Sequence, residues 1–141
     1  MLDWDHQLDI IREDSKDSTG AVNAHKISIL NIEDGEVLTS TDQDNTFKIS
    51  QEEAKIIADA FKSKDFSTFE NDGITIEEIN YTFRNNVDGK IVLARKKDLG
   101  TLTIQATTTK IILGLTRDGY QQSGTNLALK NIARYFGKIS L

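Results

Sequence analysis

The sequence predicts a single α+β domain, and two kinds of periodicity support this prediction. From Gly73 onward, apolar residues alternate with polar ones, which is the period of antiparallel strands with one face packed and one face open. Near both ends of the chain and around residues 51–62, apolar residues recur three or four positions apart, which is the period of a helix. Because the 141 residues contain no repeat or long linker, we assign residues 1–141 to one domain.

The first part of the chain is predicted to form a helix and then a hairpin. Residues 4–11 form a short opening helix with Trp4 on its apolar face, and a polar run follows. Residues 25–32 and 36–41 alternate as two strands, separated by Asp34-Gly35, a strong hairpin turn signal.

A second helix over residues 51–62 is predicted to begin at a capping box formed by Ser50 and Glu53. The closing helix covers about 124–137. Between these helices, strands are centred on the alternating sets Ile74/Ile76, Ile79/Tyr81/Phe83, Ile91/Leu93, Leu102/Ile104 and Ile111/Leu113/Leu115.

Composition argues against several classes of protein. The chain has no cysteine, so it has no disulfide, thiolate metal site or cysteine nucleophile. Its 17 Lys and Arg against 22 Asp and Glu give a net charge of −5, which argues against a general nucleic-acid binder. No apolar run approaches the roughly 18 residues of a membrane span. We expect a soluble, cytoplasmic protein without integral membrane association.

Motifs for catalysis are weak. The segment 42–53 superficially resembles an EF-hand calcium loop, but its sixth position, which needs glycine, is Phe47, and Glu53 is already explained by the capping box. His6 and His25 lie in separate elements without a second ligand at metal-binding spacing. Phosphate-binding and nucleophile motifs are missing as well. We therefore expect no enzyme, no cofactor and no metal.

Basic residues gather at two places in this acidic chain. Arg95-Lys96-Lys97 lies at the predicted end of a strand, and a polar, mostly basic stripe recurs every four residues on the closing helix. These could be solvated surfaces, or they could form a locally positive area for an acidic partner. The stripe consists of Asn126, Lys130, Arg134 and Lys138.

Short matches along nearly the whole chain resemble the profilin family. Residues 32–37 stand in the position of the family's "DG-x-V-W" hairpin, and residues 69–76 resemble its "F…NG-L-T-L" stretch. Residues 100–104 and 111–115 resemble its "GG-I-T-I…A-L-V-F-G-I" strand pair. The resemblance implies a central antiparallel sheet with the terminal helices together on one face and a further helix on the other. High Ile, Asp, Asn and Lys usage points to a divergent member, of the archaeal Asgard type.

The resemblance further implies that the chain binds monomeric actin and regulates its polymerisation as a monomeric cytoskeletal protein. By local alignment, the actin-binding residues would be Asn80, Thr82, Arg95, Lys97, Asn126, Lys130 and Asn131. Phosphoinositide head groups would compete for Arg95, Lys96 and Lys97.

The family's polyproline platform is only half matched. Trp4 and Tyr135 fit the pattern, but Leu38 replaces the hairpin tryptophan and Leu141 stands where an aromatic residue is frequent. Since a proline ring stacks better on an indole than on an isobutyl group, we expect weak or absent binding of proline-rich ligands.

Two alternatives to an actin binder stay open. Longin- or roadblock-like adaptor domains that regulate small GTPases also alternate helices with an antiparallel sheet. Such an adaptor would pair through a strand edge or helix and would have no affinity for actin. A small-ligand sensor would need an apolar pocket, which periodicity cannot reveal.

Overall fold

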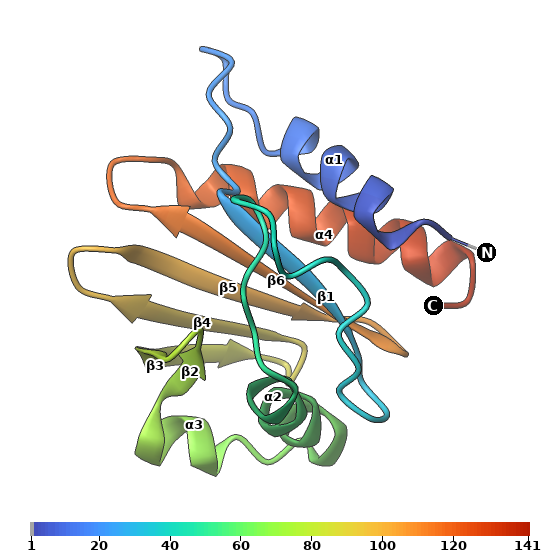
Figure 1. Ribbon diagram of the computed structural model, residues 1–141, viewed down its shortest axis with the longest axis vertical. Helices are drawn as coiled ribbons and strands as arrows, with labels where there is room; N and C mark the ends of the chain where they lie inside the picture. The colour runs from blue at the N-terminus through green and yellow to red at the C-terminus, as the bar shows by residue number, and fades with distance from the viewer. Residues whose placement is uncertain (1) are drawn as a thin grey trace.

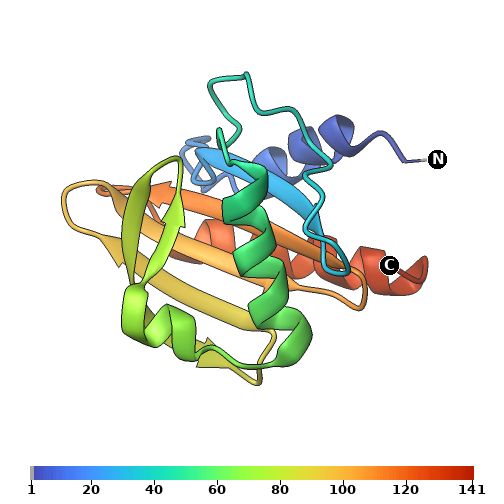
Figure 2. The ribbon, with the colours of Figure 1, turned by 60° about the horizontal axis from the view of Figure 1, so that its bottom comes forward.

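A computed structural model describes residues 2–141 as one antiparallel sheet between two layers of helices (Figure 1). The strands are β1 (Lys26–Asn31), β2 (Ile74–Ile76), β3 (Ile79–Val87), β4 (Ile91–Lys96), β5 (Gly100–Ala106) and β6 (Lys110–Arg117), in the order β1-β6-β5-β4-β3-β2. Helices α1 (Trp4–Asp14) and α4 (Gln122–Lys138) lie side by side on one face. Helices α2 (Gln51–Ser63) and α3 (Ser67–Asp72) lie on the other (Figure 2). The predicted fold class is confirmed.

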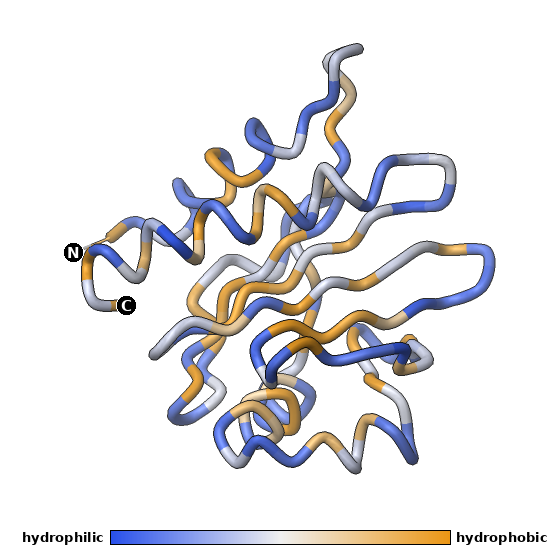
Figure 3. The backbone as a smooth tube through the Cα atoms, turned by 180° about the vertical axis from the view of Figure 1, so that it is seen from behind, coloured by the Kyte–Doolittle hydropathy of each residue, from blue (hydrophilic) through white to orange (hydrophobic). Residues whose placement is uncertain are grey.

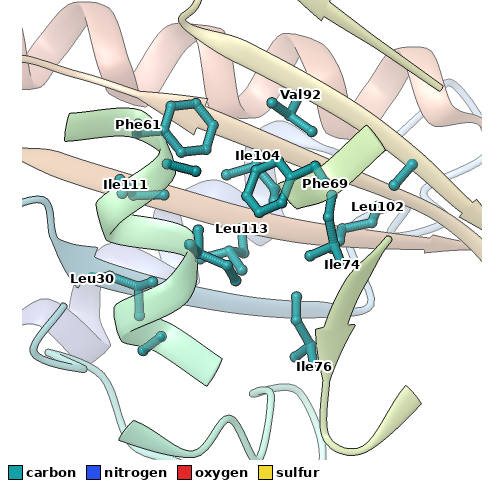
Figure 4. Close-up of a cluster of buried hydrophobic side chains, with 14 of the residues drawn as sticks. Leu30, Phe61, Phe69, Ile74, Ile76, Val92, Leu102, Ile104, Ile111 and Leu113 are labelled. Atoms are coloured by element: carbon teal, nitrogen blue, oxygen red, sulfur yellow. The ribbon is translucent and has the colours of Figure 1, made fainter. Parts of the chain in front are cut away.

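The larger of two hydrophobic cores lies between the sheet and the α2–α3 layer. Phe61 of α2 and Phe69 of α3 point toward Ile74, Ile104 and Leu113 of the strands (Figure 4). The two phenylalanine rings stack edge to face with centroids 6.4 Å apart. This contact ties the two helices to each other and to the sheet.

The second core lies under α1 and α4, both of which alternate hydrophobic and hydrophilic residues when seen from behind (Figure 3). Leu8, Ile11 and Phe136 pack there against Ile29 and Ile112 of the central strands. Helices therefore cover β1, β5 and β6 on both faces, and their residues are buried in continuous runs. The prediction of one open face is wrong for β5 and β6, and it holds for β3. In β4 the faces are exchanged, because Val92 and Ala94 are buried whereas the predicted Ile91 and Leu93 face the open side.

The predicted strand over residues 36–41 is wrong, although its turn forms. Gly35 adopts φ +76°, and a Cβ there would lie 2.8 Å from the Lys55 backbone, so glycine is required. The returning chain pairs with β1 only through a bridge at Val37. It then leaves the sheet, because Ser40 donates its backbone N–H (2.8 Å) and its hydroxyl (2.5 Å) to the Asp5 carboxylate of α1.

Helix α3 is an element that periodicity did not predict. It spans only six residues, too few to establish a helical repeat. Its start is marked by Asp65, whose carboxylate accepts hydrogen bonds from the backbone N–H and the hydroxyl of Ser67. These bonds lower the pKa of Asp65, with the Ser67 hydroxyl as the larger cause.

One carboxylate holds the start of α2 to the β2–β3 turn. The predicted capping box forms. The Glu53 carboxylate accepts a hydrogen bond from the Ser50 backbone N–H at 3.0 Å, and the Ser50 hydroxyl accepts one from the Glu53 backbone N–H. The same carboxylate accepts the N–H groups of Glu77 and Glu78, each at 3.0 Å. Both turn residues have positive φ (57° and 65°), the conformation of a two-residue hairpin turn that favours glycine. We call these contacts the Glu53 clamp.

Replacing Glu78 with glycine is expected to stabilise the protein by about 0.5–1 kcal/mol, because glycine adopts positive φ without steric strain. The Glu78 side chain is exposed, so its removal forfeits little packing. Chemical denaturation of Glu78→Gly against wild type measures the gain. Glu77→Gly is the matched comparison: it loses bonds from Lys26 Nζ (3.0 Å) and the Lys48 N–H (2.6 Å), so we expect no net gain. Equal gains from both variants would contradict this account.

Candidate functional site

The α1–α4 layer stops at β5, so β3 and β4 are uncovered on that face. A groove of about 400 Å³ follows the boundary between these strands and the N-terminal half of α4. Leu127 of α4 is 55% exposed and Val87 of β3 is 41% exposed, and both belong to one contiguous apolar patch with Ile91 and Leu93. We call it the open-face groove; its lining residues are Val87, Ile91, Leu93, Thr103, Gln105, Ser123, Asn126, Leu127 and Lys130.

A β-bulge turns Val87 into the groove. The register of β3 against β4 shifts between Phe83 and Asn85, which changes which residues face the core. After the bulge, Asn86 pairs with Val92 and Val87 pairs with Ile91. Since Val92 faces the core and Ile91 faces the groove, Val87 joins the apolar floor of the groove.

Polar side chains fix the edges of this groove. The Thr103 hydroxyl donates to Asn126 Oδ1 at 2.6 Å, which ties β5 to α4. Thr101, two residues earlier on the same face of β5, pairs with Arg95 of β4. The Arg95 guanidinium forms an ion pair with Asp118 at 2.9 Å, and both side chains are about 40% exposed. An exposed ion pair therefore stands beyond one end of the apolar floor.

The structure brings some of the predicted actin-binding residues together. Asn126 and Lys130 line the open-face groove, and Thr82 lies opposite Arg95 in the β3–β4 register. Asn80 lies farther along β3, where its amide donates to the Asp72 carbonyl at 2.8 Å and to Thr75 Oγ1 at 3.0 Å. The helical spacing of α4 turns Asn131 away from Lys130 by about 100°, and Lys97 lies in the β4–β5 turn. Of the seven predicted residues, only Asn126 and Lys130 belong to the groove lining.

The three basic residues of the second prediction do not share one surface. Arg95 and Lys96 are neighbours in β4, so their side chains leave opposite faces of the sheet. Arg95 is paired with Asp118, whereas within residues 2–141 Lys96 and Lys97 form no ion pair. The apolar floor of the groove was missed altogether, because Ile91 and Leu93 read as ordinary strand residues.

The loop from β6 to α4 is anchored by a histidine. The Arg117 backbone N–H donates to His25 Nδ1 at 3.2 Å, and the imidazole packs edge to face on Tyr120 at 4.3 Å. Partial burial lowers the pKa of His25, and the nearby Arg117 charge lowers it further. Only the neutral ring can accept this bond, so the loop depends on an unprotonated histidine.

We expect this anchor to weaken in acid. The pKa of His25 in the folded protein lies below its ordinary value of 6.5. The contribution of the neutral imidazole to the free energy of folding is therefore complete above pH 6.5, and it is lost as the pH falls through the pKa of His25 in the folded protein. An NMR titration should give a pKa below 6.5 for His25, and the amide of Arg117 should shift with the same midpoint. His25→Gln, which cannot titrate, should remove that midpoint at Arg117; a midpoint that persists would show another group to be responsible.

The four residues of the predicted polyproline platform meet around Phe136. Trp4, Leu38 and Leu141 are partly buried against the same core, and the Trp4 ring lies edge-on to Phe136 with centroids 5.7 Å apart. Tyr135 is 44% exposed beside Phe136. Leu141 is held in place because its N–H donates to the Phe136 carbonyl at 2.7 Å. We call this set the aromatic cluster.

Lys110 is a member of this surface that sequence reasoning missed. Its Nζ lies 5.6 Å from the centre of the Trp4 ring and 2.8 Å from Asn31 Oδ1. Asn31 and Lys110 are paired in the β1–β6 register, so the sheet topology brings this cation to the indole. A lysine over the ring interacts favourably with its π face, and so it competes with any ligand that would stack there.

The EF-hand-like segment uses its residues for folding. Glu53, its final carboxylate, accepts three backbone N–H groups in the Glu53 clamp, and Phe47 is fully buried in the core. Over residues 2–141 no group of three or more His, Cys, Asp or Glu side chains is arranged to hold a metal ion. In the same range, no helix is long and apolar enough to cross a membrane.

The open-face groove has an exposed apolar floor and a polar rim, which is the usual composition of a surface that binds another protein. Comparisons with known proteins assign the family of the chain. A family model described as Profilin matches residues 4–141, and the profilin of Heliocidaris crassispina is 36% identical over 140 residues, which cover 99% of this chain and 100% of the relative. The chain therefore belongs to the profilin family, and an actin-binding regulator is the function that this membership supports.

Solved structures agree with this assignment at the level of the fold. Acanthamoeba castellanii profilin II superposes with a TM-score of 0.78 at 19% identity, covering 99% of this chain and 100% of that one. Mouse profilin IIa, solved in complex with a double repeat from the FH1 domain of mDia1, superposes with a TM-score of 0.63 at 17% identity. The match covers 84% of this chain and 90% of the mouse chain. Myxococcus xanthus MglB superposes with a TM-score of only 0.55 at 12% identity, covering 97% of this chain and 95% of that one. The adaptor alternative is therefore weaker than the profilin assignment.

Proposed function

We propose that the protein binds monomeric actin through the open-face groove and thereby suppresses spontaneous nucleation. The observation that supports this most strongly is the apolar floor at Val87, Ile91, Leu93 and Leu127, which is exposed in a chain of a known actin-binding family. An exposed apolar centre with a polar rim is the usual composition of a protein interface. Lys130 at its edge would speed the encounter with an acidic partner, whereas the charge of Arg95 is offset by Asp118.

Titration of the purified protein into monomeric actin tests this proposal. We expect dose-dependent suppression of spontaneous polymerisation at low salt, with the effect weakening as salt rises because the rim charges are screened. Unchanged nucleation at a large excess of the protein, together with no detectable binding to the monomer, would contradict it. Size-exclusion chromatography separates the adaptor alternative, since that class forms dimers and we propose a monomer.

A phosphoinositide effect is proposed for Lys96 and Lys97. Both are exposed at the end of β4 and in the turn that follows, where a phosphorylated head group could contact them. Lys96 leaves the face of the sheet opposite Arg95, so we propose that such a head group binds this strand end without covering the open-face groove. Sedimentation with vesicles containing phosphatidylinositol bisphosphate tests this. Binding should weaken in Lys96→Gln with Lys97→Gln and persist in Lys16→Gln with Lys138→Gln, which removes two exposed charges elsewhere.

Weak binding of proline-rich ligands is proposed for the aromatic cluster. Leu38 and Leu141 offer no ring for stacking, and Lys110 competes for the π face of Trp4. A proline-rich peptide should give no saturation at millimolar concentration by tryptophan fluorescence. Saturable binding that is lost in Trp4→Ala would contradict this proposal. From family membership we further propose a cytoplasmic, cytoskeletal location; an archaeal source stays a prediction, since the relative compared above is an animal protein.

A further inference from the structure

The α2–α3 layer carries a second exposed apolar surface, on the face of the sheet opposite the open-face groove (Figure 2). Ile56 of α2 is 54% exposed, almost the same fraction as Leu127. Two depressions meet at Ile56 and Thr68, which line both. Together we call them the α2–α3 groove, which the actin-binding proposal does not use.

The deeper depression is suited to one apolar side chain. Ile57, Phe69 and Ile74 form its floor, and it holds about 150 Å³. Helical spacing continues the surface into the shallower depression, because Ile56, Ala60 and Ser63 recur at i, i+4 and i+7 on one face of α2.

The rim of the α2–α3 groove is acidic. Glu53 and Asp72 border the deeper depression, and Asp59 and Asp65 border the shallower one. Among residues 2–141, no lysine or arginine lines either depression. Four carboxylates around an apolar floor favour a positively charged partner by direct complementarity.

Of the four rim carboxylates, only Asp59 has a lysine partner among residues 2–141. Lys62 lies on the flank of α2 away from Ile56, where its Nζ pairs with Glu33 at 2.8 Å. Lys55 lies on the same flank and reaches only Asp59, at 3.5 Å. Hydrogen bonds from Ser67 lower the pKa of Asp65, so its charge persists to lower pH than that of an ordinary aspartate.

We propose that the α2–α3 groove docks a basic protein segment that places one aliphatic or aromatic side chain in the deeper depression, against the exposed Ile56 and over the buried floor of Ile57, Phe69 and Ile74. The occupant is a partner whose lysines or arginines flank this anchor, because the rim has four carboxylates and the floor accommodates a single side chain. The sheet separates this site from the open-face groove, so the segment and an actin monomer bind at the same time.

A synthetic peptide of about twelve residues, rich in lysine and carrying one phenylalanine, tests the proposal by NMR on the isotopically labelled protein. We expect saturable shifts at the amides of Ile56, Thr68 and Asp72, weakening as salt rises. A peptide with glutamate in place of lysine should cause no such shifts, and replacing the phenylalanine with alanine should weaken binding at least about tenfold. Shifts centred elsewhere, or none at millimolar peptide, would overturn the proposal.

Two variants locate the effect without disturbing the fold. Ile56→Lys places a positive charge on an exposed position and should weaken peptide binding at least about tenfold. Asp59→Asn with Asp72→Asn removes two rim charges and should weaken it several-fold, whereas Asp42→Asn with Asp44→Asn changes the net charge equally in a distant loop and should not. Equal weakening by both double variants would overturn the proposal by reducing it to overall charge.

Actin binding is measured on the same samples. If Ile56→Lys loses the peptide but still suppresses nucleation, the two surfaces are independent, as proposed. Loss of both activities in Ile56→Lys with an unchanged melting temperature would overturn the separation of the two sites. Peptide binding without any effect of the wild-type protein on actin would contradict the proposed actin function and leave the α2–α3 groove supported.

Discussion

Leu127→Asp is expected to lower the affinity for monomeric actin about 100-fold, which corresponds to about 2.8 kcal/mol. Leu127 is 55% exposed and stands over the apolar floor formed by Val87 and Leu93. A carboxylate there would be buried without a partner when actin covers the groove, and an unpaired buried charge opposes binding strongly. The loss should appear mainly as faster dissociation.

The fold should tolerate this change, because substitutions at exposed positions usually alter stability by about 0.5 kcal/mol or less. Ile10→Asp is the matched control: Ile10 is 38% exposed on the outer surface of α1, away from the open-face groove. It should bind actin as wild type does. A Leu127→Asp protein with wild-type affinity would exclude the open-face groove as the actin site, and equal losses in both variants would point to a general effect of charge.

Glu53→Ala should destabilise the protein by about 2 kcal/mol and lower its melting temperature by roughly 6–8 °C. The substitution leaves three backbone N–H groups without their charged acceptor, at Ser50, Glu77 and Glu78. It also removes the contact that holds two residues at positive φ in the β2–β3 turn. Thermal unfolding followed by circular dichroism measures the change.

Two comparisons isolate the Glu53 clamp. Glu52→Ala removes the neighbouring exposed carboxylate, and it should change the melting temperature by no more than about 2 °C. Glu53→Gln keeps one acceptor oxygen without the charge, so we expect a loss between those of the other two variants. If Glu53→Ala and Glu52→Ala melt together, solvent satisfies the three amides and the clamp contributes little.

The elements predicted correctly are those whose signals are local. The capping box at Ser50 and the apolar spacing of the terminal helices depend on residues within a few positions of each other, and all three long helices form. The Asp34-Gly35 turn forms for the same reason. The failed strand over residues 36–41 depends on a distant contact, since Ser40 is drawn to Asp5 of α1.

The candidate site was only partly predictable for a similar reason. Simple alternation from Tyr81 and Phe83 would place Val87 in the core, and only the register shift after Phe83 turns it to the open face. The Lys110 contact with Trp4 arises from strand pairing across the whole chain. Family resemblance named Asn126 and Lys130, which line the open-face groove, but it could not show that Arg95 is engaged by Asp118.

The β-bulge in β3 lets this strand absorb a change of length without a change of surface chemistry. Arg84 is the extra residue: Phe83 pairs with Ala94 before it and Asn85 pairs with Leu93 after it. Deleting Arg84 would therefore give a regular ladder in which Val87 still lies opposite Ile91 on the open face. Among homologues, a single gap at this point should leave the open-face groove apolar, whereas a polar residue at position 87 or 91 would change what the groove binds.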